Sequence, residues 1–476
     1  MITGRLSSHI QALFGFPPTH GQAQAIDVFC RFAAEGGMRG VMLMCGSAGT
    51  GKTSLAAAMV KATCRMGQKV VLMAPTGRAA KVFALSAGMP AFTIHRKIYR
   101  QKAFTGDMTG FNLNVNLHKD TLFVVDEASM ISDSGISDSA AFGSGNLLSD
   151  LINFVYRGED CRLMLIGDKA QLPPVGGEES PALSPDVLSV YGLDVYSANL
   201  TEVLRQAANS GVLYNATRIR DMIACGGPAE LPRVKVSGFA DIRFIGGSDI
   251  VEALCASYSE VGMDETTVIT RSNRQAGIYN RGIRSMVLGR DDELASGDMV
   301  MVVRNNYYWA EKEKQAALSF IANGDRAVVQ RVRNIREIYG FRFADVSLAF
   351  SDYDDSELQA TVIMDSLHTD APSLTREQDR KLFEAVMEDY ADLPRKADRI
   401  SGIKNDAYYN ALQVKFSYAV TCHKAQGGKW EHVYVDQGYM TDDMLTPDYL
   451  HWLYTAFTRA AGKLFLVNWN RRQMEG

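Results

Sequence analysis

Residues 46–53 of this sequence read Gly-Ser-Ala-Gly-Thr-Gly-Lys-Thr, which is the complete phosphate-binding pattern G-x-x-x-x-G-K-[ST]. Glycines adopt backbone conformations closed to other residues, so successive N–H groups can converge on phosphate oxygens. We expect Lys52 to reach the β- and γ-phosphates and the Thr53 hydroxyl to hold Mg²⁺. An apolar run at 41–44 and an alanine-rich segment after the loop supply the strand–loop–helix context, and the helix N-terminus adds partial positive charge. The segment therefore predicts a nucleoside triphosphate site.

The nucleotide contacts expected in this loop extend over eight residues. They are Gly46, Ala48, Gly49, Thr50, Gly51, Lys52, Thr53 and Ser54. Upstream of the loop, Gln22 stands three residues after Thr19, which is the spacing of a helix capping box. A glutamine amide can also read the edge of an adenine. The residues alone leave both interpretations of Gln22 open.

Two further strands end in side chains suited to hydrolysis. An apolar strand at 121–125 is followed by Asp126 and Glu127. One such carboxylate can hold Mg²⁺ and the other can orient and deprotonate an attacking water, so we assign Asp126 to the metal and Glu127 to the water. Gln171 follows the strand at 162–166 and is placed to sense a γ-phosphate.

The order of elements predicts the fold class. Strand, turn and helix alternate around the loop, which indicates an α/β domain with a parallel sheet covered on both faces and a ligand crevice at the carboxyl ends of its strands. The strand at 69–74 leads to Thr76, Arg78 and Lys81, which suit phosphate contact, although for this segment taken alone a solvated helix start is the favoured interpretation. The second half repeats the strand pattern at 266–270, 416–420, 432–436 and 463–467 without a second phosphate-binding loop.

We expect three domains. The first α/β domain covers residues 1–205 and includes a hairpin at 101–118, whereas the second covers 206–324 and 414–476. Alternating apolar and polar residues predict a small β-barrel insertion at 325–413, interrupted by a helix over 376–393 that Thr375 caps.

Bulk composition bounds the class of protein. The chain has 476 residues, a net charge of −4 and seven scattered cysteines without Cys-x-x-Cys spacing, which fits a cytoplasmic protein without a disulfide framework. No apolar run approaches the roughly 20 residues of a membrane span. Because the overall charge is negative, contact with nucleic acid has to come from a local groove.

In their order, these segments resemble the superfamily-1 DNA helicases, and specifically the RecD/Dda-like branch that translocates 5′→3′. The resemblance covers nearly the whole chain and rests on the segments 19–22, 46–53, 74–81, 93–95, 126–130, 167–175, 200–206, 421–427 and 454–459.

The resemblance implies a fold and a division of roles. It implies two RecA-like domains in tandem, with ATP and Mg²⁺ in the cleft between them, and gives Gln22 adenine as its partner. Arg205 and Arg459 become arginines that reach across the cleft to the γ-phosphate. The catalytic residues on this interpretation are Lys52, Glu127, Gln171, Arg205 and Arg459.

The resemblance also implies nucleic-acid contacts. They map onto Pro75, Thr76, Arg78, Thr93, His95, Thr421, His423 and Lys424. The hairpin at 101–118 takes the position of a duplex-splitting pin, with Phe104 or Phe111 as its wedge, and the insertion at 325–413 that of an SH3-like barrel. The implied partners are single-stranded DNA and duplex junctions, and possible replication or recombination proteins, for a monomeric motor. Two alternatives stay open, namely a motor subunit with little unwinding of its own and an RNA helicase.

Overall fold

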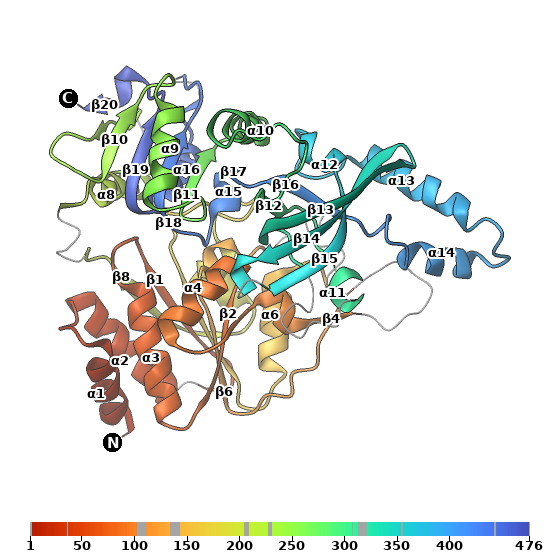
Figure 1. Cartoon of the computed structure of the whole chain (residues 1–476). Helices are drawn as coiled ribbons and strands as arrows, with labels where there is room; N and C mark the ends of the chain where they lie inside the picture. Colours follow the sequence, from red (N-terminus) through yellow and green to blue (C-terminus); the bar gives the residue numbers. More distant parts are fainter. Residues whose placement is uncertain are drawn as a thin grey trace.

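Two parallel β-sheets and one closed barrel form the framework of the molecule (Figure 1). The computed structural model describes residues 2–35, 37–101, 111–133, 143–203, 209–226, 231–306, 308–312, 321–353, 356–441 and 444–475. This arrangement is compatible with the expected pair of α/β domains and a barrel.

The first sheet has the strand order β3-β2-β6-β7-β1-β8, and all its strand pairs are parallel. Its strands are β1 (Gly40–Gly46), β2 (Lys69–Ala74), β3 (Ala91–Thr93), β6 (Thr121–Val125), β7 (Arg162–Gly167) and β8 (Asp194–Leu200). The runs at 41–44 and 121–125 are buried along their whole length. Continuous burial is what a parallel sheet covered on both faces requires.

Helices cover both faces of this sheet. Alternate strand residues such as Met42 and Val124 pack on one face, whereas Leu43 and Phe123 pack on the other. The first face is covered by α1 (Ile2–Phe14), α2 (His20–Glu35), α3 (Lys52–Arg65) and α4 (Gly77–Ala87). The second is covered by α5 (Ile94–Ile98), α6 (Leu147–Tyr156) and α7 (Pro185–Val190), with the 3₁₀ turns η1 (Ala128–Met130) and η3 (Pro181–Leu183).

The second sheet has the order β10-β19-β18-β11-β17 and is also parallel throughout. Its strands are β10 (Ile242–Ile245), β11 (Thr266–Thr270), β17 (Ala419–Thr421), β18 (Trp430–Asp436) and β19 (Ala460–Val467). The associated helices are α8 (Gly211–Ala224), α9 (Ile250–Glu260), α10 (Asn273–Gly282), the π-helical η5 (Ile283–Val287), α15 (Cys422–Ala425) and α16 (Pro447–Phe457). A short pair, β9 (Val234–Lys235) with β20 (Met474–Glu475), and the turn η8 (Arg471–Gln473) complete this domain.

The barrel reaches beyond the expected 325–413 range. It consists of β12 (Met299–Val302), β13 (Arg326–Ile338), β14 (Phe341–Phe350), β15 (Ser356–Ile363) and β16 (Leu412–Phe416), with α11 (Tyr308–Lys312) and η6 (Ser351–Tyr353) in its connections. Closure depends on the antiparallel pairing of β12 with β16, in which Val300 lies opposite Phe416. The expected range omitted β12, because the partner of that strand lies more than 100 residues away.

Three helices lie between β15 and β16, and the last two of them project away from the barrel (Figure 1). They are α12 (Asp365–His368), α13 (Arg376–Asp389) and α14 (Lys396–Lys404). The predicted capping box at Thr375 and Gln378 is confirmed, and α13 ends at Asp389 rather than at 393.

The expected hairpin at 101–118 is described only at its base. There, β4 (Tyr99–Gln101) pairs with β5 (Phe111–Leu113) in antiparallel register. Residues 102–110, with the candidate wedge Phe104, lie outside the described residues. The role of this hairpin as a pin stays a prediction.

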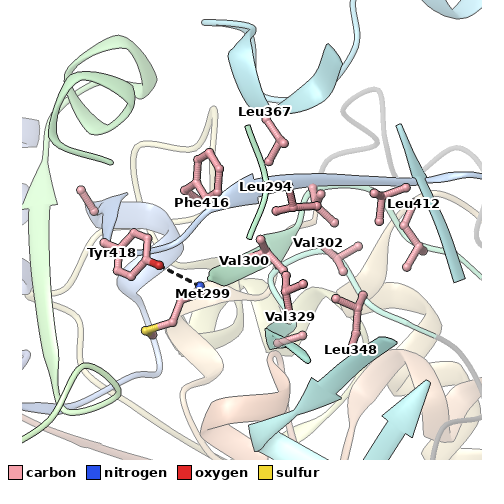
Figure 2. Packing of buried hydrophobic residues seen from close by; sticks show 14 of the residues in the cluster. Leu294, Met299, Val300, Val302, Val329, Leu348, Leu367, Leu412, Phe416 and Tyr418 are labelled. Carbon is pink, nitrogen blue, oxygen red and sulfur yellow. Dashed lines mark hydrogen bonds between the residues drawn. The ribbon is translucent and has the colours of Figure 1, made fainter. Parts of the chain in front are cut away.

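The barrel and the second sheet share one hydrophobic core. Barrel residues such as Val300 and Leu348 belong to the same buried cluster as Val268 and Tyr434 of the second sheet. Figure 2 shows Tyr418 at the edge of this cluster, where its hydroxyl accepts a hydrogen bond of 3.1 Å from the Met299 N–H. A continuous apolar core resists separation of its parts, so the barrel and the second domain are expected to move together.

A buried carboxylate stabilises the start of the barrel, next to β12. Asp298 is fully buried and accepts hydrogen bonds from Arg284 at 3.0 and 2.9 Å, from Arg290 at 2.8 Å and from the Tyr418 hydroxyl at 2.9 Å. The carboxylate therefore compensates two arginines next to β12.

We expect Asp298→Asn to destabilise the protein by roughly 3 kcal/mol, because it leaves two arginine charges without their buried partner. Urea unfolding followed by circular dichroism measures the change as a lower midpoint. The exposed Asp291→Asn is the matched control. Equal midpoints for the two variants would show that Asp298 does not fasten the barrel.

Candidate nucleotide site at the domain interface

The phosphate-binding loop lies between β1 and α3, as its sequence predicts. Gly49 and Gly51 have φ angles of 78° and 76°, in the left-handed region that favours glycine. The Lys52 ammonium donates to the Ser47 carbonyl oxygen at 2.9 Å, and the Thr50 hydroxyl donates to the same oxygen at 2.8 Å. Two side chains of the loop thus share one carbonyl oxygen within it. Ser54 follows in the first turn of α3 and is exposed.

Asp126 and Glu127 stand at the carboxyl end of β6, beside the loop. The Thr53 hydroxyl lies 3.4 Å from Asp126 Oδ2, and the Glu127 N–H donates to Asp126 Oδ1 at 2.8 Å. Burial, together with the neighbouring charge of Glu127, raises the pKa of Asp126 to about 6. A buried carboxylate of this kind needs a cation, and its oxygen and the Thr53 hydroxyl are the hard ligands that Mg²⁺ prefers. These residues therefore fit a magnesium ion.

Glu127 itself has an unusual backbone. Its φ of 54° lies in the left-handed region, which costs energy for a residue with a side chain. This conformation turns the chain directly after β6 and starts η1.

The structure brings Glu127, Gln171 and Arg459 together from two domains. The Gln171 amide lies 3.2 Å from Glu127 Oε2 and 3.2 Å from Arg459 Nη2. We assign the amide orientation that gives both contacts a donor and an acceptor, in which its nitrogen donates to the carboxylate and its oxygen accepts from the guanidinium. Arg459 Nη1 lies 3.9 Å from Glu127 Oε1. A glutamine thus links the candidate base of the first domain to the arginine of the second.

The second domain holds Arg459 firmly. The guanidinium is only 2% exposed and donates to the carbonyl oxygens of Thr455 at 3.1 Å and Gly428 at 3.2 Å. It therefore enters the cleft in a fixed direction. The other predicted arginine, Arg205, lies outside the described residues.

Gln22 makes the capping box and a second contact. Its side-chain oxygen accepts from the Thr19 N–H at 2.9 Å, and its own N–H donates to the Thr19 hydroxyl at 3.4 Å. Its amide nitrogen donates to the Thr50 carbonyl oxygen at 2.9 Å. The capping interpretation is confirmed, and the glutamine also ties α2 to the phosphate-binding loop. Its contact with adenine stays a prediction.

The sequence reasoning missed three side chains that touch or adjoin the loop. The Tyr454 hydroxyl accepts from the Ala48 N–H at 2.9 Å and donates to Asp168 Oδ2 at 2.6 Å. Arg220 of α8 donates to the Ser47 hydroxyl at 2.8 Å. Tyr454 is the first residue of the predicted 454–459 segment, and Asp168 directly follows β7. Both positions indicated residues close to the nucleotide site. Nothing in the sequence around Arg220 indicated its contact with the loop.

Lys429 brings another positive charge to the same region. Burial lowers its pKa, and the nearby charge of Arg459 lowers it further, whereas Glu127 acts in the opposite direction. The lysine therefore lies close to the Glu127–Arg459 pair.

The predicted nucleic-acid contacts form two neighbouring groups. Thr76 and Thr93 accept from backbone N–H groups as the N-caps of α4 and α5. Arg78 donates to the Lys429 carbonyl oxygen at 2.6 Å and lies 4.5 Å from the centre of the Trp430 ring. Pro75 stands between β2 and the Thr76 cap.

The second group follows β17. Thr421 occupies the N-cap position of α15 without a side-chain capping bond, His423 is exposed, and Lys424 contacts Asn323. Thr421 and Lys424 line a cleft between α10 and the barrel.

In the first group, burial lowers the pKa of His95 to about 4, so this ring is neutral near pH 7. An added Cβ on Gly427 would lie 2.9 Å from the Thr76 hydroxyl, so the two groups adjoin. Their contact with nucleic acid stays a prediction.

Among the residues that the structure describes, no helix is both long and apolar enough to cross a membrane.

Two known proteins resemble the chain in sequence. It is 25% identical to the ATP-dependent RecD2 DNA helicase of Deinococcus radiodurans over 374 residues, which cover 73% of this chain and 47% of the relative. It is 26% identical to the ATP-dependent DNA helicase dda of Enterobacteria phage T4 over 292 residues, which cover 60% of each. The chain thus spans about half the length of these relatives.

A solved structure also aligns along the chain. It is Pif1 helicase from Bacteroides in complex with ADP-AlF3 and single-stranded DNA, with a TM-score of 0.47, 12% identity and coverage of 97% of this chain and 95% of the other.

Two protein families match parts of the chain. The family described as AAA domain matches residues 19–221, and the UvrD-like helicase C-terminal domain matches residues 416–467. The first match contains the phosphate-binding loop, Glu127 and Gln171, and the second contains Arg459. These matches and the two relatives support the resemblance of the chain to the superfamily-1 helicases of the RecD/Dda-like branch.

Proposed function

We propose that this chain is an ATP-driven DNA helicase that translocates 5′→3′ along single-stranded DNA and unwinds duplex ahead of it. The observation that carries the proposal is the contact of Gln171 with both Glu127 and Arg459, because it joins a hydrolytic base to an arginine of the other domain. The relatives are ATP-dependent DNA helicases, which supports the choice of substrate.

The loop and the carboxylates supply the chemistry on the first domain. Lys52 leaves the Ser47 carbonyl to bind the β- and γ-phosphates, and Gln22 reads the adenine. Thr53 and Asp126 would hold Mg²⁺, which would supply positive charge next to the phosphates. Glu127 orients the attacking water and accepts its proton.

The second domain completes the site. With ATP bound, Arg459 keeps its direction into the cleft and interacts with the γ-phosphate in place of Glu127, so that its positive charge stabilises the transferring phosphoryl group. This exchange frees Glu127 for the water, and Gln171 senses whether the γ-phosphate is present. Arg205 is proposed as the second such arginine.

Hydrogen bonds across the interface transmit the state of the site. The Leu172 N–H donates to the Thr455 hydroxyl at 2.7 Å, and Gln426 donates to the Leu172 carbonyl oxygen at 2.7 Å. The residue after the γ-phosphate sensor is therefore bound to the second domain. Closing and opening of the cleft would let the two groups of predicted strand contacts grip and release a single strand in turn, with the 101–118 hairpin as the pin.

Lys52→Ala is expected to abolish ATP hydrolysis and leave most binding of single-stranded DNA, because the lysine contacts phosphate and not the strand. A phosphate-release assay and fluorescence anisotropy with a labelled oligonucleotide measure the two. Lys61→Ala, an exposed lysine of the same helix, is the control. Hydrolysis that survives in Lys52→Ala would refute the loop assignment.

Arg459→Ala is expected to lower kcat by a factor on the order of 10³ and to change KM for ATP by less than about threefold, because the arginine acts on the transition state. Steady-state kinetics with saturating oligonucleotide measure both constants. Arg459→Lys keeps the charge and serves where the alanine variant loses its fold. A KM that rises in proportion to the fall in kcat would argue against this role.

The direction of movement is tested on partial duplexes with a single-stranded tail. We expect unwinding from a 5′ tail and little from a 3′ tail. Unwinding from the 3′ tail alone would contradict the proposed polarity, and ATPase activity without unwinding would favour a motor subunit. Stronger stimulation of the ATPase by RNA than by DNA would favour an RNA helicase.

A further inference from the structure

We propose that Tyr454 is a positioning residue that couples occupancy of the phosphate-binding loop to the second domain: its hydroxyl holds the Ala48 amide until a phosphate oxygen displaces it. The inference rests on the proposed binding of ATP. The expectations for the 454–459 segment assigned a role to Arg459 and none to Tyr454.

The contact is buried and well formed. Tyr454 is 1% exposed and Asp168 is 3% exposed. The hydroxyl accepts from the Ala48 N–H at 2.9 Å and donates its single proton to Asp168 at 2.6 Å. Burial, with a further contribution from Asp168, raises the pKa of Tyr454, so the hydroxyl stays a neutral donor at neutral pH.

The same contact reaches the catalytic lysine. Lys52 Nζ lies 3.9 Å from the Asp168 oxygen that accepts the tyrosine proton. Tyr454 thus links the Ala48 amide to the carboxylate nearest this lysine. Both the amide and the lysine are groups that a triphosphate uses.

Two helices of the second domain enclose the tip of the loop. Leu213 of α8 lies within 3.3 Å of the position that a Cβ of Gly49 would take, and Arg220 donates to Ser47. Together with Tyr454, they contact each of residues 47–49. The tip therefore cannot rearrange around a phosphate without moving against α8 and α16.

Tyr454 and a phosphate compete for one donor. Triphosphate oxygens near pH 7 are acceptors, and the tyrosine proton is already donated to Asp168. The Ala48 N–H has one hydrogen, so a phosphate oxygen that takes it meets the lone pairs of the tyrosine oxygen. Release of Tyr454 shifts α16, which also carries Thr455 and leads to Arg459. Filling the loop would in this way reposition the arginine that completes the site.

The test is Tyr454→Phe, which removes the hydroxyl and keeps the ring. Binding of a fluorescent non-hydrolysable ATP analogue without DNA is expected to tighten by about threefold to tenfold, the range of one neutral hydrogen bond. KM for ATP falls likewise, whereas the DNA-stimulated kcat decreases because α16 is no longer displaced. A merely structural role would not lower KM.

Tyr449→Phe is the matched control. Tyr449 is a buried tyrosine of the same helix whose hydroxyl bonds Gln437 and Gln473, away from the loop. It should leave affinity for the analogue unchanged. Equal affinity of wild type and Tyr454→Phe would overturn the proposal, and weaker binding would do the same by showing that the hydroxyl is a phosphate ligand. A wild-type protein that binds no ATP analogue would instead refute the proposed function.

A second measurement keeps the hydroxyl in place. We expect the ¹⁹F chemical shift of 3-fluorotyrosine at position 454 to change when the analogue binds. The shift should stay constant when the equally labelled Lys52→Ala variant is titrated with the same concentrations of analogue. An unchanged shift in the nucleotide-saturated protein would overturn the proposal even if Tyr454→Phe does not fold.

Discussion

Buried polar contacts at the cleft hold the two parallel-sheet domains together, and the rest of the account depends on them. The N–H groups of Ala48 and Leu172 in the first domain donate to side chains of the second, and the Gln171 side chain has one partner in each domain. A buried polar group without a partner is costly. A ligand that offers better hydrogen-bond partners can therefore open or rearrange this interface. An interface made of apolar contacts would not respond to such a ligand.

The other large contact is of the opposite kind. The barrel and the second sheet share one apolar core, and Asp298 fastens its edge. The molecule thus consists of a first domain and a larger body, joined by an interface whose hydrogen bonds a nucleotide can exchange. Because the phosphate-binding loop lies at this interface, nucleotide would replace hydrogen bonds between the two bodies there. The predicted strand contacts lie on both sides of the division, as translocation requires.

Local signals predicted most of the first domain and the start of helix α13 in the insertion. The loop, the buried strands and the capping boxes at Thr19 and Thr375 depend on neighbours within a few residues, and the structure has them where expected. The meeting of Glu127 with Arg459 came from the resemblance, because no local pattern joins residues more than 300 positions apart. Tyr454 and Arg220 were missed for the same reason, since their contacts exist only after two domains have docked. The barrel boundary moved because β12 is recognised by its partner β16 rather than by its own four residues.

Nucleotide in the loop is expected to move the first domain against the body formed by the second domain and the barrel. Cys64 on α3, Cys255 on α9 and Cys225 are exposed, and the other four cysteines are buried. Replacing Cys225 by serine leaves Cys64 and Cys255 as the two exposed thiols for labelling. Fluorescence energy transfer between dyes on these two cysteines then reports the distance between the domains. We predict a change in transfer efficiency when a non-hydrolysable ATP analogue binds in the presence of single-stranded DNA, and its absence in Lys52→Ala. An efficiency that stays constant from the free to the nucleotide-saturated protein would contradict the account.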